Sequence, residues 1–143
     1  MAIKSFNTLI KLHKRRVDVI RREMRTLEEQ RTQLLALSLT LRAEYAREVE
    51  ISSSDAKMAG FFGAYAMRVQ KRQEAIAQEV KKLDVTIEEK AELIRAEFAE
   101  QKKFEIAKTH ALKKLADQEK YRQQSRFDEV ASQQYMKLKE TPV

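Results

Sequence analysis

Cysteine and tryptophan are absent from this chain of 143 residues, and glycine and proline are nearly absent. Without cysteine the chain can form no disulfide, and it has no thiolate to act as a nucleophile or metal ligand. Only two glycines and one proline occur, and the proline, Pro142, is the next to last residue. Because so few residues interrupt a helix, the sequence predicts long continuous helices.

Large apolar side chains are also scarce: aromatic residues make up 7% of the chain, whereas charged residues make up 36%. A narrow seam between helices needs fewer large apolar side chains than a globular core. No apolar run approaches the roughly 18 to 20 residues of a membrane span, and the first residues lack an apolar segment of signal-peptide type. We therefore expect one helical, rod-like domain over residues 1–143 in the cytoplasm.

A seven-residue repeat marks the first predicted helix, over about residues 3–50. Alternating steps of four and three connect twelve positions, of which nine are apolar: Phe6, Ile10, His13, Val17, Ile20, Met24, Leu27, Arg31, Leu34, Ser38, Leu41 and Tyr45. This mean spacing of about 3.5 residues is typical of a left-handed coiled coil.

The repeat fails where three serines precede Asp55, so a turn is predicted at about residues 51–55. Ser52 and Asp55 have the spacing of a capping box. The second helix is predicted over about residues 56–140, although Gly60 and Gly63 leave open a regular start only after Phe62. Its repeat begins at Phe62 and continues through Val69, Gln73, Ile76, Val80, Leu83, Ile87, Lys90 and Ile94.

Two helices joined by so short a turn predict an all-α fold, an antiparallel coiled-coil hairpin whose second helix is longer. Pairing about residue 53 aligns residue 4 with residue 103, so residues from about 105 onward are expected to overhang. A single polar helix is marginally stable in water. We therefore expect a partner to stabilise the overhang.

Catalytic and metal-binding patterns are missing from the sequence. The two histidines, His13 and His110, fall on opposite arms of the predicted hairpin, too far apart to share a metal ion. Two glycines are too few for a Gly-rich phosphate loop. The carboxylates are expected to be solvated and ionised, with no pocket to shift their pKa values. The sequence thus predicts a protein that is not an enzyme and has no cofactor.

Basic residues gather in two segments: residues 1–25 hold eight basic and two acidic residues, and residues 101–125 hold seven basic and three acidic. Such segments can bind nucleic acid, anionic lipid or an acidic protein surface. Of a solvated coiled-coil flank, an acidic protein cavity and nucleic acid, nucleic acid is the least favoured. The heptad seam runs through the first segment, and no aromatic side chains alternate with the basic ones for stacking on bases.

Aromatic residues crowd into the start of the second helix, where Phe61, Phe62, Tyr65 and Val69 fall within nine residues. A two-helix seam takes one residue in every three or four, so Phe61 and Phe62 cannot both face inward. The surplus ring either covers the hairpin tip or belongs to an aromatic patch that binds a partner.

The layout and several local patterns together resemble the flagellar FliJ family. The opening Leu9-Ile-Lys-Leu-His-Lys-Arg-Arg, the post-turn Phe62-Gly-Ala-Tyr-Ala-Met-Arg-Val, and the tail with Leu112-Lys-Lys-Leu and Glu119-Lys-Tyr are similar to the corresponding parts of that family. The resemblance covers nearly the whole chain.

The resemblance implies a non-enzymatic component of the flagellar type III export apparatus, similar to the stalk of rotary ATPase γ subunits. Its expected partners are the hexameric export ATPase, whose ring it enters and activates, and the cytoplasmic domain of the membrane export gate. Export chaperones are a further candidate partner. The expected location is the cytoplasmic face of the inner membrane.

The resemblance also implies two contact surfaces. Carried over to this chain, the gate-binding surface falls on Tyr65 and Val69 and extends to Phe61 and Phe62; at Arg72 an arginine replaces a small residue of the family. The surface for the ATPase ring is expected to use basic residues near both termini: Lys11, Lys14, Arg15, Arg16, Arg21, Arg22, Lys102, Lys103 and Lys108.

Two alternatives remain open from the sequence. The chain has the features of the equivalent stalk of a virulence-type secretion system, and composition does not separate that stalk from a flagellar one. It also has the features of a generic cytoplasmic coiled-coil adaptor or scaffold that self-associates through its overhang.

Overall fold

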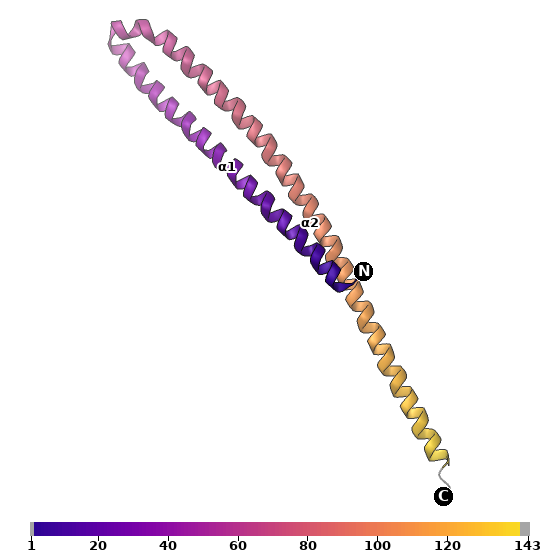
Figure 1. The fold of residues 1–143 in the computed structure, drawn as a ribbon. Helices are drawn as coiled ribbons and strands as arrows, with labels where there is room; N and C mark the ends of the chain where they lie inside the picture. The colour runs from indigo at the N-terminus through magenta and orange to yellow at the C-terminus, as the bar shows by residue number, and fades with distance from the viewer. Residues whose placement is uncertain (1, 141–143) are drawn as a thin grey trace. The chain divides into compact units, whose positions relative to one another are not determined.

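The computed structural model describes residues 2–140, apart from the side chain of Met58, as two helices packed into a hairpin (Figure 1). Helix α1 spans Ile3–Ser54, and helix α2 spans Ala56–Glu140. The two helices run antiparallel, and α2 is the longer, so the predicted all-α hairpin is confirmed. In the described part of the chain, no stretch of either helix has the length and apolar character that crossing a membrane requires.

The turn is shorter than the predicted segment 51–55, because α1 continues to Ser54 and only Asp55 separates the helices. The serine hydroxyls donate to carbonyl oxygens of their own helix, Ser52 to Glu48 at 2.8 Å and Ser53 to Glu50 at 2.8 Å. Their hydroxyl groups are thereby satisfied without ending the helix. The predicted capping box is therefore wrong.

Asp55 itself is the N-cap of α2. Its Oδ1 accepts a hydrogen bond from the backbone N–H of Lys57 at 3.0 Å, and its carbonyl oxygen accepts one from Ala59 at 3.2 Å. A capping carboxylate satisfies one of the free N–H groups in the first turn of a helix. Because α2 starts directly after this cap, Gly60 and Gly63 both lie within the helix.

The helices divide into two compact units, and residues 15–97 form one of them. Its seam follows the predicted repeats, with Val17, Leu41, Ile76 and Leu83 buried to between 2% and 9% exposure. The other predicted seam positions of this unit are at least partly shielded. Among the described residues no large side chain is below 2% exposure, as expected where only two helices meet.

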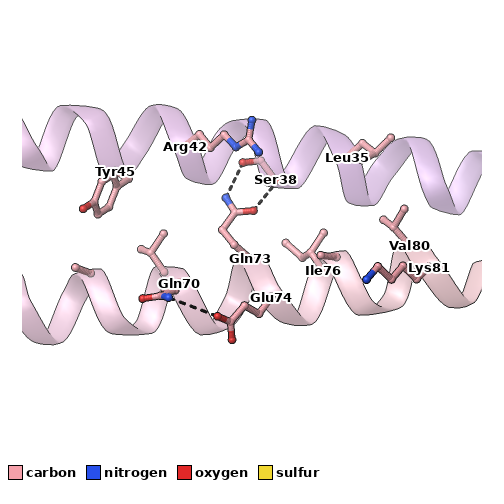
Figure 2. A pocket seen from close by; sticks show the side chains of 13 residues that line it. Leu35, Ser38, Arg42, Tyr45, Gln70, Gln73, Glu74, Ile76, Val80 and Lys81 are labelled. Atoms are coloured by element: carbon pink, nitrogen blue, oxygen red, sulfur yellow. Dashed lines mark hydrogen bonds between the residues drawn. The ribbon is translucent and has the colours of Figure 1, made fainter.

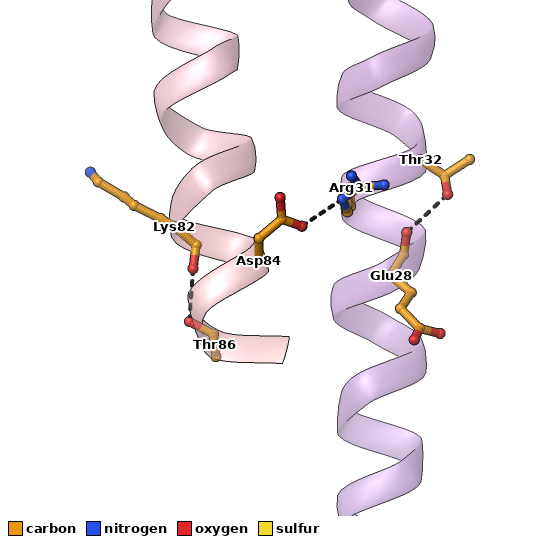
Figure 3. Close-up of polar contacts among 6 residues, drawn as sticks. All are labelled: Glu28, Arg31, Thr32, Lys82, Asp84 and Thr86. Carbon is orange, nitrogen blue, oxygen red and sulfur yellow. Dashed lines mark hydrogen bonds and ion pairs between the residues drawn. The ribbon is translucent and has the colours of Figure 1, made fainter. Parts of the chain in front are cut away.

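Salt bridges flank this seam and connect the two helices. The guanidinium Nε of Arg31 lies 2.6 Å from Asp84 Oδ1 (Figure 3), and Lys90 Nζ lies 2.6 Å from Glu23 Oε2. Arg31 is a predicted seam position, and its polar head reaches the edge of the seam to meet the carboxylate.

The second unit contains the first fourteen residues of the chain and those from Phe98 onward. Phe6, Ile10 and His13 are buried, and the His13 ring stacks on Phe104 with 5.6 Å between centroids. His13 therefore occupies a seam position, as predicted.

The overhang within this unit starts later than predicted. All described residues from Leu112 to Glu140 are exposed, whereas residues 104–108 still include shielded side chains. Aligning residue 4 with residue 103 would place His13 opposite residue 94, whereas His13 meets Phe104. The later reversal at Asp55 accounts for part of this shift in pairing. The α2 overhang is defined here as residues 112–140.

Candidate partner-binding surfaces

Three aromatic rings from both helices form a cluster near the turn. The ring of Tyr45 on α1 lies 5.6 Å from that of Phe62 and 6.4 Å from that of Tyr65, centroid to centroid, and the latter two rings are 6.3 Å apart. All three side chains are partly shielded. Phe62 and Tyr65 thus pack against α1, since such ring spacings are typical of favourable aromatic pairs.

Beside this cluster, α1 and α2 flank an open groove of about 850 Å³, the interhelical groove (Figure 2). Its lining residues come from both helices: Leu35, Ser38, Arg42, Tyr45, Ala66, Val69, Gln70, Gln73, Glu74, Ile76, Ala77, Val80 and Lys81. Apolar and small side chains make up much of the lining, and Arg42, Glu74 and Lys81 supply charge. A concave apolar surface with a few polar groups is the usual form of a binding site.

A polar pair crosses the seam at this groove. The Ser38 hydroxyl donates to Gln73 Oε1 at 2.6 Å, and Gln73 Nε2 donates back to the Ser38 carbonyl oxygen at 2.9 Å (Figure 2). Both are seam positions where apolar residues are usual. A reciprocal pair of this kind fixes the register of the two helices, and the small serine leaves space that a leucine side chain would fill.

The residues predicted to contact an export gate do not share one surface. Val69 lines the groove, and Phe62 and Tyr65 face α1 beside it. Phe61 is 77% exposed, and Arg72 is exposed but does not line the groove. The structure therefore confirms that Phe61 and Phe62 cannot both face inward, and it leaves the surplus ring uncovered.

Sequence reasoning missed part of the α1 side of the groove. Ser38 and Tyr45 are predicted seam positions, whereas Leu35 and Arg42 lie outside the predicted repeat. Their steps of three, four and three place all four along one edge of the helix. The signal for Leu35 is the widening of the apolar stripe between Leu34 and Leu41.

Three of the basic residues that were predicted to contact the ATPase ring come together in the unit that holds both ends of the described chain. Lys11, Lys14 and Lys108 line a groove of about 440 Å³ with apolar contributions from Ile10 and Leu112, and one carboxylate, that of Glu105, also lines it. This basic groove lies where the α2 overhang begins. A carboxylate-rich surface with an apolar centre is complementary to it.

Two neighbouring lysines differ in their surroundings. Lys103 Nζ donates to Glu100 Oε1 at 2.9 Å, and this bond is the main reason that the pKa of the Glu100 carboxyl lies below its usual value. His13 makes a smaller contribution in the same direction. Lys102 is exposed. Part of the Lys103 charge is therefore compensated within the chain.

The four arginines that were predicted to contact the ATPase ring belong to the unit formed by residues 15–97, and all four are exposed. Arg16 lies 3.8 Å from Glu97 Oε1, and Arg22 Nε donates to the Asp18 carbonyl oxygen at 3.3 Å. Arg15 and Arg21 are the other two arginines of this set. None of the four lines the basic groove.

Within residues 2–140, no three or more histidine and carboxylate side chains are placed to hold a metal ion. His13 is buried against Phe104, whereas His110 is exposed.

Comparison with protein-family models, with curated proteins and with solved structures finds no match to this chain.

Proposed function

We propose that this protein is a non-enzymatic stalk subunit of a flagellar-type export apparatus, as its resemblance to the FliJ family implies. It acts on the cytoplasmic face of the inner membrane and binds two partners, the hexameric export ATPase and the cytoplasmic domain of the export gate. The observation that carries the proposal is the basic groove of Lys11, Lys14 and Lys108 beside an exposed helical overhang.

The basic groove and the overhang support the ATPase contact. Three lysines around Ile10 and Leu112 attract an acidic surface over a distance and then bury apolar area on contact. The overhang exposes apolar residues that no described part of the chain covers, among them Leu115, Phe127 and Leu138. A ring that surrounds the overhang would supply the missing partner.

ATP hydrolysis by the purified cognate export ATPase, measured as this protein is added, tests the contact. The expected result is stimulation that saturates near one chain per ATPase hexamer. The triple variant Lys11→Glu, Lys14→Glu, Lys108→Glu is expected to lose the stimulation. The matched control Lys57→Glu, Lys71→Glu, Lys82→Glu makes the same change in net charge away from the basic groove. An active ATPase that does not respond to the wild-type protein would contradict the proposal.

The interhelical groove supports the gate contact. It joins Val69 to the Tyr45 cluster and presents an apolar lining at a helix pair, which suits an apolar segment of the gate domain. Because buried aromatic residues dominate binding energies, Tyr45→Ala combined with Val69→Ala is expected to weaken gate binding by at least about ten-fold. Phe61→Ser is the control, since Phe61 lies outside the groove. Unchanged binding of the double variant would remove this half of the proposal.

A second candidate, a self-associating coiled-coil adaptor, is favoured by the same exposed overhang. Phe127, Val130 and Leu138 are 77%, 52% and 77% exposed, and a second chain would cover them as well as a ring would. Light scattering distinguishes the two functions. A monomer at micromolar concentration agrees with the stalk, whereas a stable dimer that disappears when the overhang is deleted agrees with the adaptor.

A further inference from the structure

One face at the start of α2 carries basic charge alone. It is defined by residues at successive steps of four and three, together with a neighbour, and is called here the α2 basic face: Lys57, Phe61, Ala64, Arg68, Lys71 and Arg72. Residues with this spacing share one side of a helix, and all six are exposed. Between Ala56 and Gln73, α2 contains four basic and no acidic residues.

An uncovered aromatic ring lies in the middle of this face. Phe61 is 77% exposed, and the ten residues from Met58 to Met67 carry no charge. Met67 is 61% exposed, and a Cβ added at Gly60 or Gly63 would meet nothing within 4 Å. Phe61 lines neither groove described above, and its ring is largely exposed to solvent.

The cations of this face have no carboxylate partner in the part of the chain that is described: the salt bridges found there use none of Lys57, Arg68, Lys71 or Arg72. The acidic residues near the turn lie elsewhere, Glu44, Glu48 and Glu50 on α1 and Asp55 between the helices. Residues 42–55 also hold two arginines, so their net charge is −2, whereas residues 56–73 have a net charge of +4. Net positive charge near the turn is therefore concentrated on α2.

We propose that the α2 basic face binds the surface of an anionic lipid bilayer. Phe61 enters the headgroup region, and the four cations lie against lipid phosphates. Basic side chains around an exposed aromatic ring are the usual composition of a helix that lies in a membrane interface. A fluid bilayer accepts a protruding ring without a preformed pocket, whereas an acidic protein partner must provide one. The carboxylates on α1 orient the hairpin with α2 toward the lipid.

This inference goes beyond the proposed function and uses different residues. The interhelical groove is lined by Tyr45 and Val69, whereas the basic face is centred on Phe61. Tyr45→Ala with Val69→Ala is expected to leave lipid binding intact, and the failure of either proposal leaves the other standing.

Fluorescence provides the first test, because the chain has no tryptophan and a single substitution supplies an unambiguous probe. Phe61→Trp in the full chain is expected to show a blue-shifted emission and weaker acrylamide quenching with vesicles of equal parts phosphatidylcholine and phosphatidylglycerol. Pure phosphatidylcholine vesicles are expected to cause no shift. Phe127→Trp is the matched control, since Phe127 is also 77% exposed and follows an arginine. An equal shift of both probes, or no shift of the Phe61 probe, would overturn the proposal.

Co-sedimentation with the same vesicles tests the cations. Each basic residue near an anionic surface contributes a factor of about five in binding, so Arg68→Glu with Lys71→Glu is expected to reduce binding by about 25-fold or more. Lys120→Glu with Arg122→Glu makes the same charge change on the overhang and is expected to have a much smaller effect. Equal losses would show that the whole basic chain, and not this face, binds lipid. Binding of a poly-aspartate peptide without vesicle binding would assign the face to an acidic protein.

Discussion

Two stretches of one helix, residues 98–111 and residues 112–140 of α2, have the same kinds of side chains but different surroundings. In the first, Phe104 stacks on His13 of α1; in the second, Phe127 is 77% exposed. Both stretches are rich in residues with high helix propensity. The comparison shows that propensity makes each stretch helical, whereas the N-terminal end of α1 decides where burial ends.

The spacing of apolar residues does not separate the two stretches. In the overhang, Leu112 and Leu115, Phe127 and Val130, and Tyr135 and Leu138 each stand three residues apart, a step that a seam also uses. The end of α1, and not a change of pattern, therefore explains why these side chains are exposed.

The largest difference between paired and unpaired helix is expected from truncating a leucine in each. Leu41 is 7% exposed and Leu138 is 77% exposed. Leu41→Ala is expected to lower the free energy of unfolding by about 2 kcal/mol or more through lost burial and a cavity. Leu138→Ala is expected to change it by less than about 0.5 kcal/mol. Urea unfolding followed by circular dichroism measures both, and equal losses would mean that the overhang packs on the seam.

A smaller effect is expected at the polar pair of the seam. Gln73→Leu alone leaves Ser38 without its partner and is expected to cost about 1–2 kcal/mol. Adding Ser38→Ala to Gln73→Leu removes both polar groups and is expected to recover most of that loss. The register between the two helices is then expected to be less strictly defined. A double-mutant cycle from the same urea experiment measures the coupling. Additive losses would contradict a cooperative pair.

Glycine replacement at the turn end of α2 is expected to stabilise the protein. Neither Gly60 nor Gly63 has a positive φ or a close neighbour, so alanine fits at both positions. Each substitution is expected to add about 0.8–1 kcal/mol by helix propensity. Ser132→Ala in the overhang raises helix propensity too, but it is expected to leave the cooperative thermal transition unchanged. A lower melting temperature for Gly60→Ala would indicate that a close contact needs the glycine.

The smallest effect is expected at the salt bridge between Arg31 and Asp84, whose side chains are 41% and 50% exposed. Exposed ion pairs contribute little because water and salt screen them. The coupling energy from Arg31→Ala and Asp84→Ala is expected to be below about 0.5 kcal/mol and to fall further in high salt. A coupling well above 1 kcal/mol would mean that the pair sets the register together with Ser38 and Gln73.

Most of the fold could be predicted from the sequence, because a heptad repeat predicts both that a segment is helical and which side of the helix is buried. The seam positions from Phe6 to Tyr45 are all at least partly shielded. The turn was less predictable, since serine suits both a cap and a helix whose hydroxyls bond to carbonyls of the preceding turn. Ser52 does the latter. A shift of a few residues there displaces the start of the overhang.

The surfaces were predictable only in part. The sequence grouped Phe61 and Val69 in one patch after the turn, whereas Val69 lines a groove and Phe61 is exposed outside it. The grouping of Tyr45 with Val69, and of Lys11 with Lys108, depends on the register between the helices. Register is set by the turn and by pairs such as Ser38 and Gln73, which a repeat within one helix does not encode.

The single-residue break at Asp55 also determines the order in which contacts between the two helices form during folding. Pairs across the seam join residues 35, 53 and 67 positions apart, in the order Ser38–Gln73, Arg31–Asp84 and Glu23–Lys90. Each more distant pair closes a longer loop unless the nearer one has formed first. Folding is therefore expected to start beside Asp55 and proceed like a zipper. Substitutions near the turn should then slow folding, whereas those far from it should mainly speed unfolding.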